Sequence, residues 1–167
     1  MKLSKRVLGL GSAVAVAGTL ALTGITGAAA SGSSSGFIHV TLMGTNPANN
    51  ATRTIIVTGA FTAGGIDHSG NKTDNLVFPD GTLTIVHIRT AGTQRFNSTT
   101  CLGQIAENGT YVLGGGTGAY KGITGHGIYR ANITIVSARD SSGACTNKLP
   151  PAAFQFIVRA QGPVSGA

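Results

Sequence analysis

Short runs of β-branched and aromatic residues, separated by turn-forming residues, recur along the chain after residue 36. Such runs are typical of β-strands, and clusters of glycine, proline and asparagine between them are typical of turns. No segment after residue 30 keeps a helical period. The pattern predicts extended chain at 37–43, 53–61, 75–78, 82–90, 95–101, 102–105, 110–113, 128–138 and 154–160.

The segments between these runs are predicted to be turns or loops. Residues 63–71 are glycine-rich and polar and are expected to form a loop. Pro79-Asp80-Gly81 has the residues of a tight turn, and Glu107-Asn108-Gly109 is predicted to be a hairpin turn through its Asn-Gly pair. Residues 139–147 form a further predicted turn.

About eight short strands without helices predict an all-β domain. The architecture is either a single closed antiparallel β-barrel or a β-sandwich. A closed barrel has no exposed strand edges, which an all-β protein must otherwise protect.

Residues 114–127 hold seven glycines in fourteen positions, with strand-like sequence on both sides. Glycine is the default residue where the backbone needs a positive φ or approaches another backbone closely. The stretch therefore predicts a tight connection between two neighbouring antiparallel strands. Its structural glycines are Gly115, Gly116, Gly118, Gly122, Gly125 and Gly127.

A dinucleotide-binding loop is the competing interpretation of this stretch. That loop needs a helix directly after its glycines, and a Walker loop needs a Gly-Lys-Ser/Thr ending. Further glycines follow here instead, and the Gly-Lys-Ser/Thr ending is missing. No nucleotide cofactor is expected, and no other cofactor is indicated.

The pattern Gly-Gly-Thr-Gly-x-Tyr-x-Gly-x-x-Gly-x-Gly at 115–127, with Tyr120 at the aromatic position, resembles a hairpin of the allene oxide cyclase-like and dirigent-like β-barrel proteins. More loosely, the resemblance extends from Phe37 to the end of the chain, and it is greatest to small secreted bacterial members. It implies a barrel whose lumen binds small apolar molecules. Cyclases of this group enclose a reactive intermediate, and dirigent proteins guide the coupling of radicals made elsewhere.

Residues 1–30 have the pattern of a secretory signal peptide, with a basic start, an apolar centre and Ala28-Ala29-Ala30 as a cleavage site. The alternative is a membrane anchor, but the apolar run is short and interrupted by glycines. The prediction is a secreted, extracellular protein with no membrane span after cleavage. Residues 31–36 would be a flexible Gly/Ser leader, and residues 37–167 a single barrel domain.

Removal of the signal peptide would leave nine basic and five acidic residues, a net charge of +4. The basic residues are dispersed along the chain, whereas nucleic-acid-binding proteins concentrate them on one surface. We therefore expect no nucleic-acid partner. The sequence does not set the oligomeric state, so a homo-oligomer stays open.

Cys101 and Cys145 are the only cysteines. In an exported protein they are expected to form a disulfide, worth at most about 4 kcal/mol in the chain-entropy model. A catalytic thiol is the alternative, and it would need a neighbouring base. A zinc site needs about four ligands at shorter spacings, so no metal site is predicted.

Candidate functional residues come from the lumen that a barrel would enclose. His87 and Arg89 lie within the predicted strand 82–90, on the same face as Leu83 and Ile85. If that face points inward, the two polar side chains need partners or a ligand. The opposite face is also apolar, so an outward, solvated His87 and Arg89 is the alternative. The other candidates are Tyr111 and Tyr120 as lumen residues, and Glu107 at the mouth of the barrel.

Three functions fit these observations. The first is binding of a small hydrophobic or aromatic metabolite in the lumen, without turnover. The second is a cofactor-free cyclase or isomerase that shapes a polyunsaturated or polyketide-like substrate, with His87, Arg89, Tyr120 and Glu107 as catalytic candidates. The third is an envelope or interaction protein whose barrel is filled by its own side chains.

Overall fold

The structure is a computed structural model, and it describes residues 35–48 and 51–166. The predicted signal peptide, residues 1–30, and residues 31–34 of the predicted leader lie outside the described residues. No helix within the described ranges is long and apolar enough to span a lipid bilayer.

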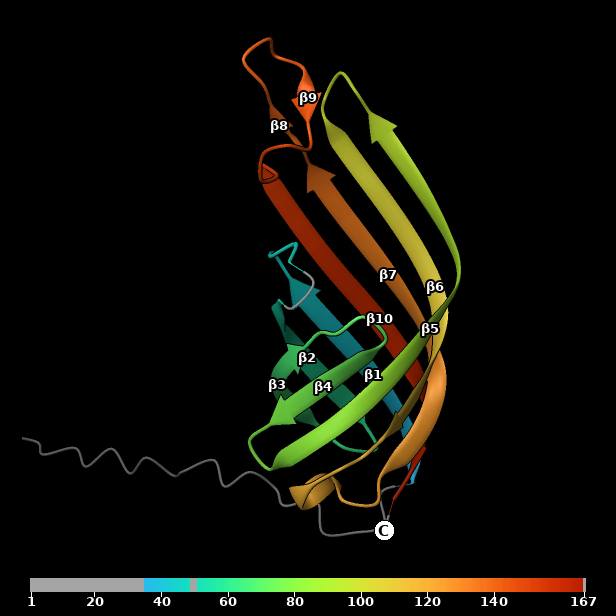
Figure 1. Ribbon diagram of the computed structural model, residues 1–167. Helices are drawn as coiled ribbons and strands as arrows, with labels where there is room; N and C mark the ends of the chain where they lie inside the picture. Colours follow the sequence, from blue (N-terminus) through green and yellow to red (C-terminus); the bar gives the residue numbers. More distant parts are fainter. Residues whose placement is uncertain (1–34, 49–50, 167) are drawn as a thin grey trace, which may run out of the picture.

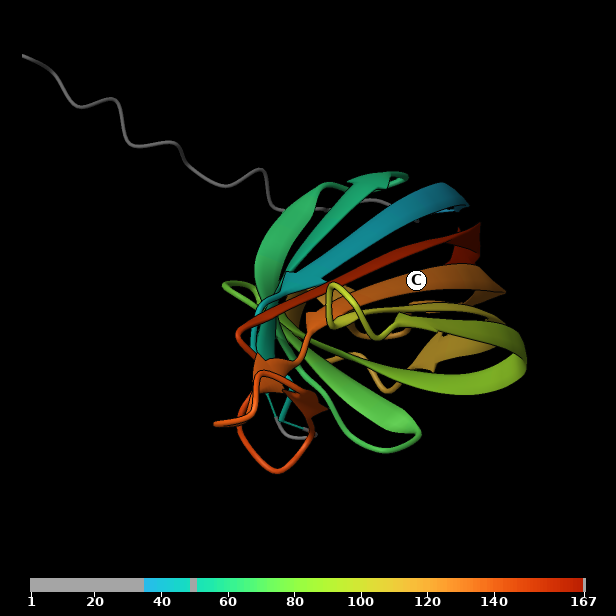
Figure 2. The ribbon, with the colours of Figure 1, turned by 90° about the horizontal axis from the view of Figure 1, so that it is seen from above.

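Eight antiparallel strands are hydrogen-bonded into a closed barrel in the order β1-β10-β7-β6-β5-β4-β3-β2 (Figures 1 and 2). The predicted all-β barrel is therefore confirmed. The strands of the ring are β1 (Gly36–Gly44), β2 (Thr52–Gly59), β3 (Ala63–His68), β4 (Thr73–Phe78), β5 (Gly81–Asn97), β6 (Leu102–Gly114), β7 (Thr124–Val136) and β10 (Ala153–Ser165).

Four of these strands are much longer than the other four. β5 has 17 residues and β6, β7 and β10 have 13 each, whereas β1 to β4 have between 6 and 9. The long strands continue beyond the ring as a curved four-stranded sheet, here called the extension (Figure 1). It consists of residues 88–97 of β5, 102–110 of β6, 128–136 of β7 and 153–155 of β10.

The lower end of the barrel in Figure 1 is filled by apolar side chains. Residues alternate between the two faces of each strand, so every second residue points inward. In β2, for example, Ile55 and Val57 are buried, whereas Ile56 between them is 43% exposed. The packed residues include Ile38, Val40, Ile55, Val57, Leu76, Leu83, Leu113 and Val164.

The glycine-rich stretch connects β6 to β7, so the predicted connection between neighbouring antiparallel strands is confirmed. It contains the short 3-10 helix η1 (Gly118–Tyr120). The Ala119 amide donates a hydrogen bond to the Asp80 carbonyl at 2.8 Å, which ties the connection to the β4–β5 turn. Gly118 has a φ of +57° and its Cα lies against this turn, so only glycine fits there without strain.

Two turn predictions are wrong. Residues 63–71 were expected to form a loop, but residues 63–68 form β3, whose Asp67 has its partner on β2. Glu107-Asn108-Gly109 was expected to form a hairpin turn, but it lies inside β6 and pairs with both neighbouring strands. Gly109 provides space rather than a turn, because a Cβ there would collide with the Tyr129 ring.

The predicted segments 82–90 and 95–101 belong largely to a single strand, β5, with a β-bulge between Arg89 and Ala91. The predicted segments 102–105 and 110–113 likewise form parts of β6. Between β7 and β10, the predicted turn contains a small hairpin of β8 (Ala138–Arg139) and β9 (Cys145–Thr146).

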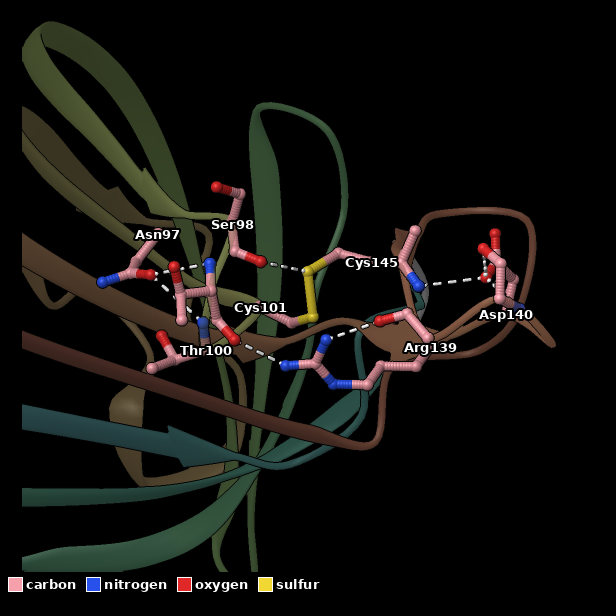
Figure 3. The surroundings of a disulfide bond; sticks show 11 residues. Asn97, Ser98, Thr100, Cys101, Arg139, Asp140 and Cys145 are labelled. Atoms are coloured by element: carbon pink, nitrogen blue, oxygen red, sulfur yellow. Dashed lines mark hydrogen bonds between the residues drawn. A yellow bond between two sulfur atoms is a disulfide. The ribbon is translucent and has the colours of Figure 1, made fainter.

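The predicted disulfide between Cys101 and Cys145 is confirmed, with an S–S distance of 2.01 Å (Figure 3). It joins the β5–β6 turn to the β8–β9 hairpin. The Arg139 guanidinium supports the same junction, because it donates hydrogen bonds to the Thr99 and Gly143 carbonyls, each at 2.6 Å. The disulfide therefore fixes the hairpin at the upper end of the extension.

Candidate ligand-binding site

A cavity of about 350 Å³ lies inside the barrel, beyond the packed lower end and at the base of the extension. One side of its wall is apolar and comes from β1, β7 and β10. The residues of this side are Leu42, Ala131, Phe156, Val158 and Ala160. The other side is mostly polar and comes from five strands, β2 and β4 to β7, each of which directs at least one polar side chain into the cavity.

The first polar pair is formed by Arg53 on β2 and Asp67 on β3, which are direct cross-strand partners. Arg53 Nη1 lies 3.6 Å from Asp67 Oδ2, and the Ser69 hydroxyl donates a hydrogen bond to the same oxygen at 2.6 Å. Burial raises the pKa of Asp67 to about 6. The Arg53 guanidinium also lies 4.2 Å from the centre of the Phe156 ring, so it links the polar side of the wall to the apolar side.

The second polar pair is formed by Asp74 on β4 and His87 on β5. Asp74 Oδ2 lies 3.6 Å from His87 Nε2, and Asp74 Oδ1 accepts a hydrogen bond from the Gly70 amide at 2.9 Å. The contact with the Asp74 carboxylate raises the pKa of His87 above its ordinary value. Because 28% of the His87 side chain remains accessible, it can meet a molecule in the cavity.

The third polar group is formed by Glu107 on β6, Tyr129 on β7 and Arg89 on β5. The Tyr129 hydroxyl donates a hydrogen bond of 2.7 Å to Glu107 Oε1, and Arg89 Nε lies 3.5 Å from Glu107 Oε2. Burial, and then the contact with Glu107, raises the pKa of Tyr129. Tyr129 therefore stays protonated and holds the Glu107 carboxylate in place.

Each basic side chain of this wall has one acidic partner. Arg53 pairs with Asp67, His87 with Asp74, and Arg89 with Glu107. The wall is consequently rich in hydrogen-bonding groups without a large excess of either charge. Such a wall favours ligands with uncharged polar groups over anions or cations, because a charged ligand would need an unpaired counter-charge.

Of the five predicted candidates, the structure brings four together and separates one. His87, Tyr111 and Glu107 line the cavity, and Arg89 reaches Glu107 from the same inner face. Tyr120 lies at the opposite, packed end of the barrel, with its ring 5.5 Å from that of Phe61 and 5.0 Å from that of Phe78.

The inward alternative for His87 is the one that the structure shows. Leu83 and Ile85 on the same face are buried, whereas Val86 and Ile88 on the other face are 43% and 62% exposed. The outer face of β5 is therefore apolar and exposed, and the polar residues are inside.

Sequence reasoning missed three residues of the polar wall, Arg53, Asp74 and Tyr129. It also missed Asp67, the buried partner of Arg53. One cue for Arg53 was available, because it alternates in phase with Ile55 and Val57, which are typical core residues. No sequence pattern pointed to Asp67, because residues 63–71 were predicted to form a loop. No group of three or more His, Cys, Asp or Glu side chains in the described part of the chain could hold a metal ion.

Comparisons of the chain with protein-family models, with curated proteins and with solved structures give no match.

Proposed function

We propose that the protein is a secreted barrel that binds a small hydrophobic or aromatic metabolite in its cavity, without turnover. The observation that carries the proposal is the half-apolar, half-polar cavity of about 350 Å³ above a packed floor. Small-molecule sites have volumes of roughly 300–1,000 Å³, and their walls are mostly apolar with a few placed polar groups. A dry cavity of about 150 Å³ already holds one benzene ring.

The wall also indicates how such a metabolite would lie. Its apolar body would pack against Phe156, Val158 and Ala160, and an uncharged polar group would face His87 and Glu107. The paired charges of the polar side leave neutral ligands as the favoured class.

The glycine-rich hairpin and the eight-stranded antiparallel ring support a relationship to the allene oxide cyclase-like and dirigent-like barrels, in which ligands occupy the lumen. The disulfide indicates an oxidising, extracytoplasmic location. The signal-like residues 1–30 support secretion as the route to that location.

Native mass spectrometry of the secreted protein, after incubation with extract from the producing culture, tests the proposal. The wild type should retain a small molecule. Ala160→Phe, which places a large ring inside the cavity, should lose it, whereas Ala106→Phe on the exposed outer face of β6 should keep it. Thermal unfolding of both variants checks that they are folded. A wild type that retains nothing, or an Ala160→Phe variant that binds as before, would contradict the proposal.

A cofactor-free isomerase or cyclase is the second candidate. The observation that favours it is that His87 and Glu107 face one cavity, so a proton could be taken up at one group and released at the other. His87→Gln and Glu107→Gln should then slow product formation on a defined polyunsaturated substrate. Unchanged turnover in both variants would remove them from the reaction.

The third candidate is a filled barrel that acts only through its outer surface. The packed lower end is the observation that supports it. The cavity above that end favours the ligand-binding proposal over it.

A further inference from the structure

The extension leaves one edge of its sheet without a partner. β4 pairs with β5 only as far as Val86, and the last backbone contact on that side is the bond from the His87 amide to the Lys72 carbonyl at 2.9 Å. From residue 88 to residue 97, β5 pairs with β6 alone among the described residues (Figure 1). Alternate backbone N–H and C=O groups along these ten residues point away from the sheet.

The opposite edge of the extension is protected. Only residues 153–155 of β10 lack a second neighbour, because β1 covers the strand from Phe156 onward. Pro150 and Pro151 lie two residues before this short edge, and proline cannot extend a ladder of hydrogen bonds. The extension therefore has one long open edge and one short edge that is preceded by prolines.

The open edge carries few of the devices that keep edge strands apart. Residues 90–97 (Thr-Ala-Gly-Thr-Gln-Arg-Phe-Asn) contain no proline and one charged side chain, Arg95. The β-bulge between Arg89 and Ala91 falls at the lower end of this segment, at Thr90, and leaves residues 91–97 regular. Phe96 near the end of the edge is 54% exposed. The segment is long enough and polar enough to accept another strand in water.

We propose that residues 90–96 pair antiparallel with the same segment of a second copy of the chain, which gives a two-fold symmetric dimer. This assembly is independent of the proposed ligand-binding function. The two extensions would form one continuous sheet, and the two barrels would lie at its opposite ends because the paired strands run in opposite directions.

Charge does not oppose a second copy as the occupant. With Thr93 on the two-fold axis, Arg95 of one copy lies opposite Ala91 of the other. The two Arg95 residues are then four positions apart along the strand, about 13 Å, which exceeds the screening length of about 8 Å at physiological ionic strength. Thr93 faces Thr93, and threonine pairs are favourable across strands.

Symmetry favours the same arrangement. When the open edges of two copies pair with each other, neither copy keeps a free edge for a third, so the assembly stops at a dimer. Pairing of the β5 edge with the β10 edge of another copy would grow into an open fibre, and the short, proline-flanked β10 edge opposes it.

A cysteine at the proposed axis tests the contact directly. In Thr93→Cys the two thiols would lie on directly opposed residues, whose Cα atoms are about 4.5–5.5 Å apart, within disulfide range. Oxidation should give covalent dimers on a non-reducing gel. The matched control is Thr110→Cys, which is exposed on the outer face of the central strand β6, between Ile88 and Ile128, and should not cross-link.

Sedimentation equilibrium of the unmodified protein, Thr93→Lys and Thr110→Lys over a wide concentration range gives the second measurement. The unmodified chain should dimerise, and Thr93→Lys should raise the dissociation constant up to about fivefold, because it places two like charges opposite each other. Thr110→Lys should not change it. A monomer at every concentration, cross-linking through Thr110→Cys rather than Thr93→Cys, or equal dissociation constants for both lysine variants would overturn the proposal.

Discussion

Arg53 on β2 and Asp67 on β3 face each other across the sheet, with Nη1 3.6 Å from Oδ2, and the Asp67 side chain has no exposed surface. The Asp67 carboxylate is therefore fully buried. Burial disfavours its charged form, whereas the Arg53 guanidinium and the Ser69 hydroxyl stabilise that form. Burial is the larger effect, so the pKa of Asp67 is raised from 3.8 to about 6.

This raised pKa predicts how stability depends on pH. Between about pH 4 and 6 the folded state holds a proton on Asp67 that the unfolded state has already lost, so the free energy of unfolding should fall as pH rises through this window. The full change is about 3 kcal/mol, and its contribution ends above pH 6, where both states are ionised. Urea denaturation at a series of pH values measures it.

Asp67→Asn should remove this part of the pH dependence, whatever its effect on stability at neutral pH. The control is Asp80→Asn, which changes an exposed acid in the β4–β5 turn and should keep the wild-type slope. A wild-type slope in Asp67→Asn would show that another group titrates in this window.

His87 and Asp74 predict a second pH-dependent effect, in which the titrating group is the base His87. Because the folded-state pKa of His87 is raised by Asp74, the stabilisation from the pair is complete below pH 6.5 and is lost as pH rises through the raised value. Asp74→Asn should lower the pKa of His87, measured from its imidazole resonances by NMR. His39 on β1 serves as the internal control, and an unchanged His87 titration would contradict the assignment.

The disulfide should contribute to stability mainly by restricting the unfolded chain. Replacement of Cys101 and Cys145 by serine should lower the free energy of unfolding by at most about 4 kcal/mol for their separation of 44 residues. Denaturant titration of the oxidised wild type and of the double variant measures the difference. The wild type under reducing conditions should match the double variant, and a loss well above this value would indicate that the junction with Arg139 also fails.

The glycine-rich connection should be sensitive at some of its glycines and tolerant at others. Gly118→Ala should destabilise the protein by roughly 1–3 kcal/mol, because Gly118 has a φ of +57° and a Cβ there would meet the Asp80 carbonyl. Gly114→Ala is the matched control, since a Cβ at Gly114 has no atom within 4 Å. Equal unfolding midpoints for the two variants would contradict this account of the connection.

Most of the fold could be predicted from local sequence because strands alternate with turn-forming residues. The errors occurred where glycine serves another purpose than turning. Gly109 makes room for the Tyr129 ring, so the Asn108-Gly109 pair resembles a turn although it lies in the middle of β6. The lengths of β5 and β6 depend on pairing with each other, which local patterns do not contain.

The candidate site was predictable only in part. Alternation along β5 placed His87 and Arg89 on the face of Leu83 and Ile85, and this was enough to make them candidates. Arg53 and Asp67 become partners only through the register of β2 against β3. Tyr111 and Tyr120 show the remaining difficulty, because both were predicted to face the lumen but they lie at different levels of the barrel, one in the cavity wall and one in the packed end.

The separation of the cavity wall from the packed end of the barrel has a consequence for the evolution of the protein. Tyr120, Phe61 and the glycine-rich connection at the packed end line no part of the cavity. Five strands, β2 and β4 to β7, each supply a part of the polar wall, so a single substitution there would alter the selectivity of the proposed binding while the packed end of the barrel stays intact. The barrel is therefore a good starting point for laboratory evolution of new binding specificities.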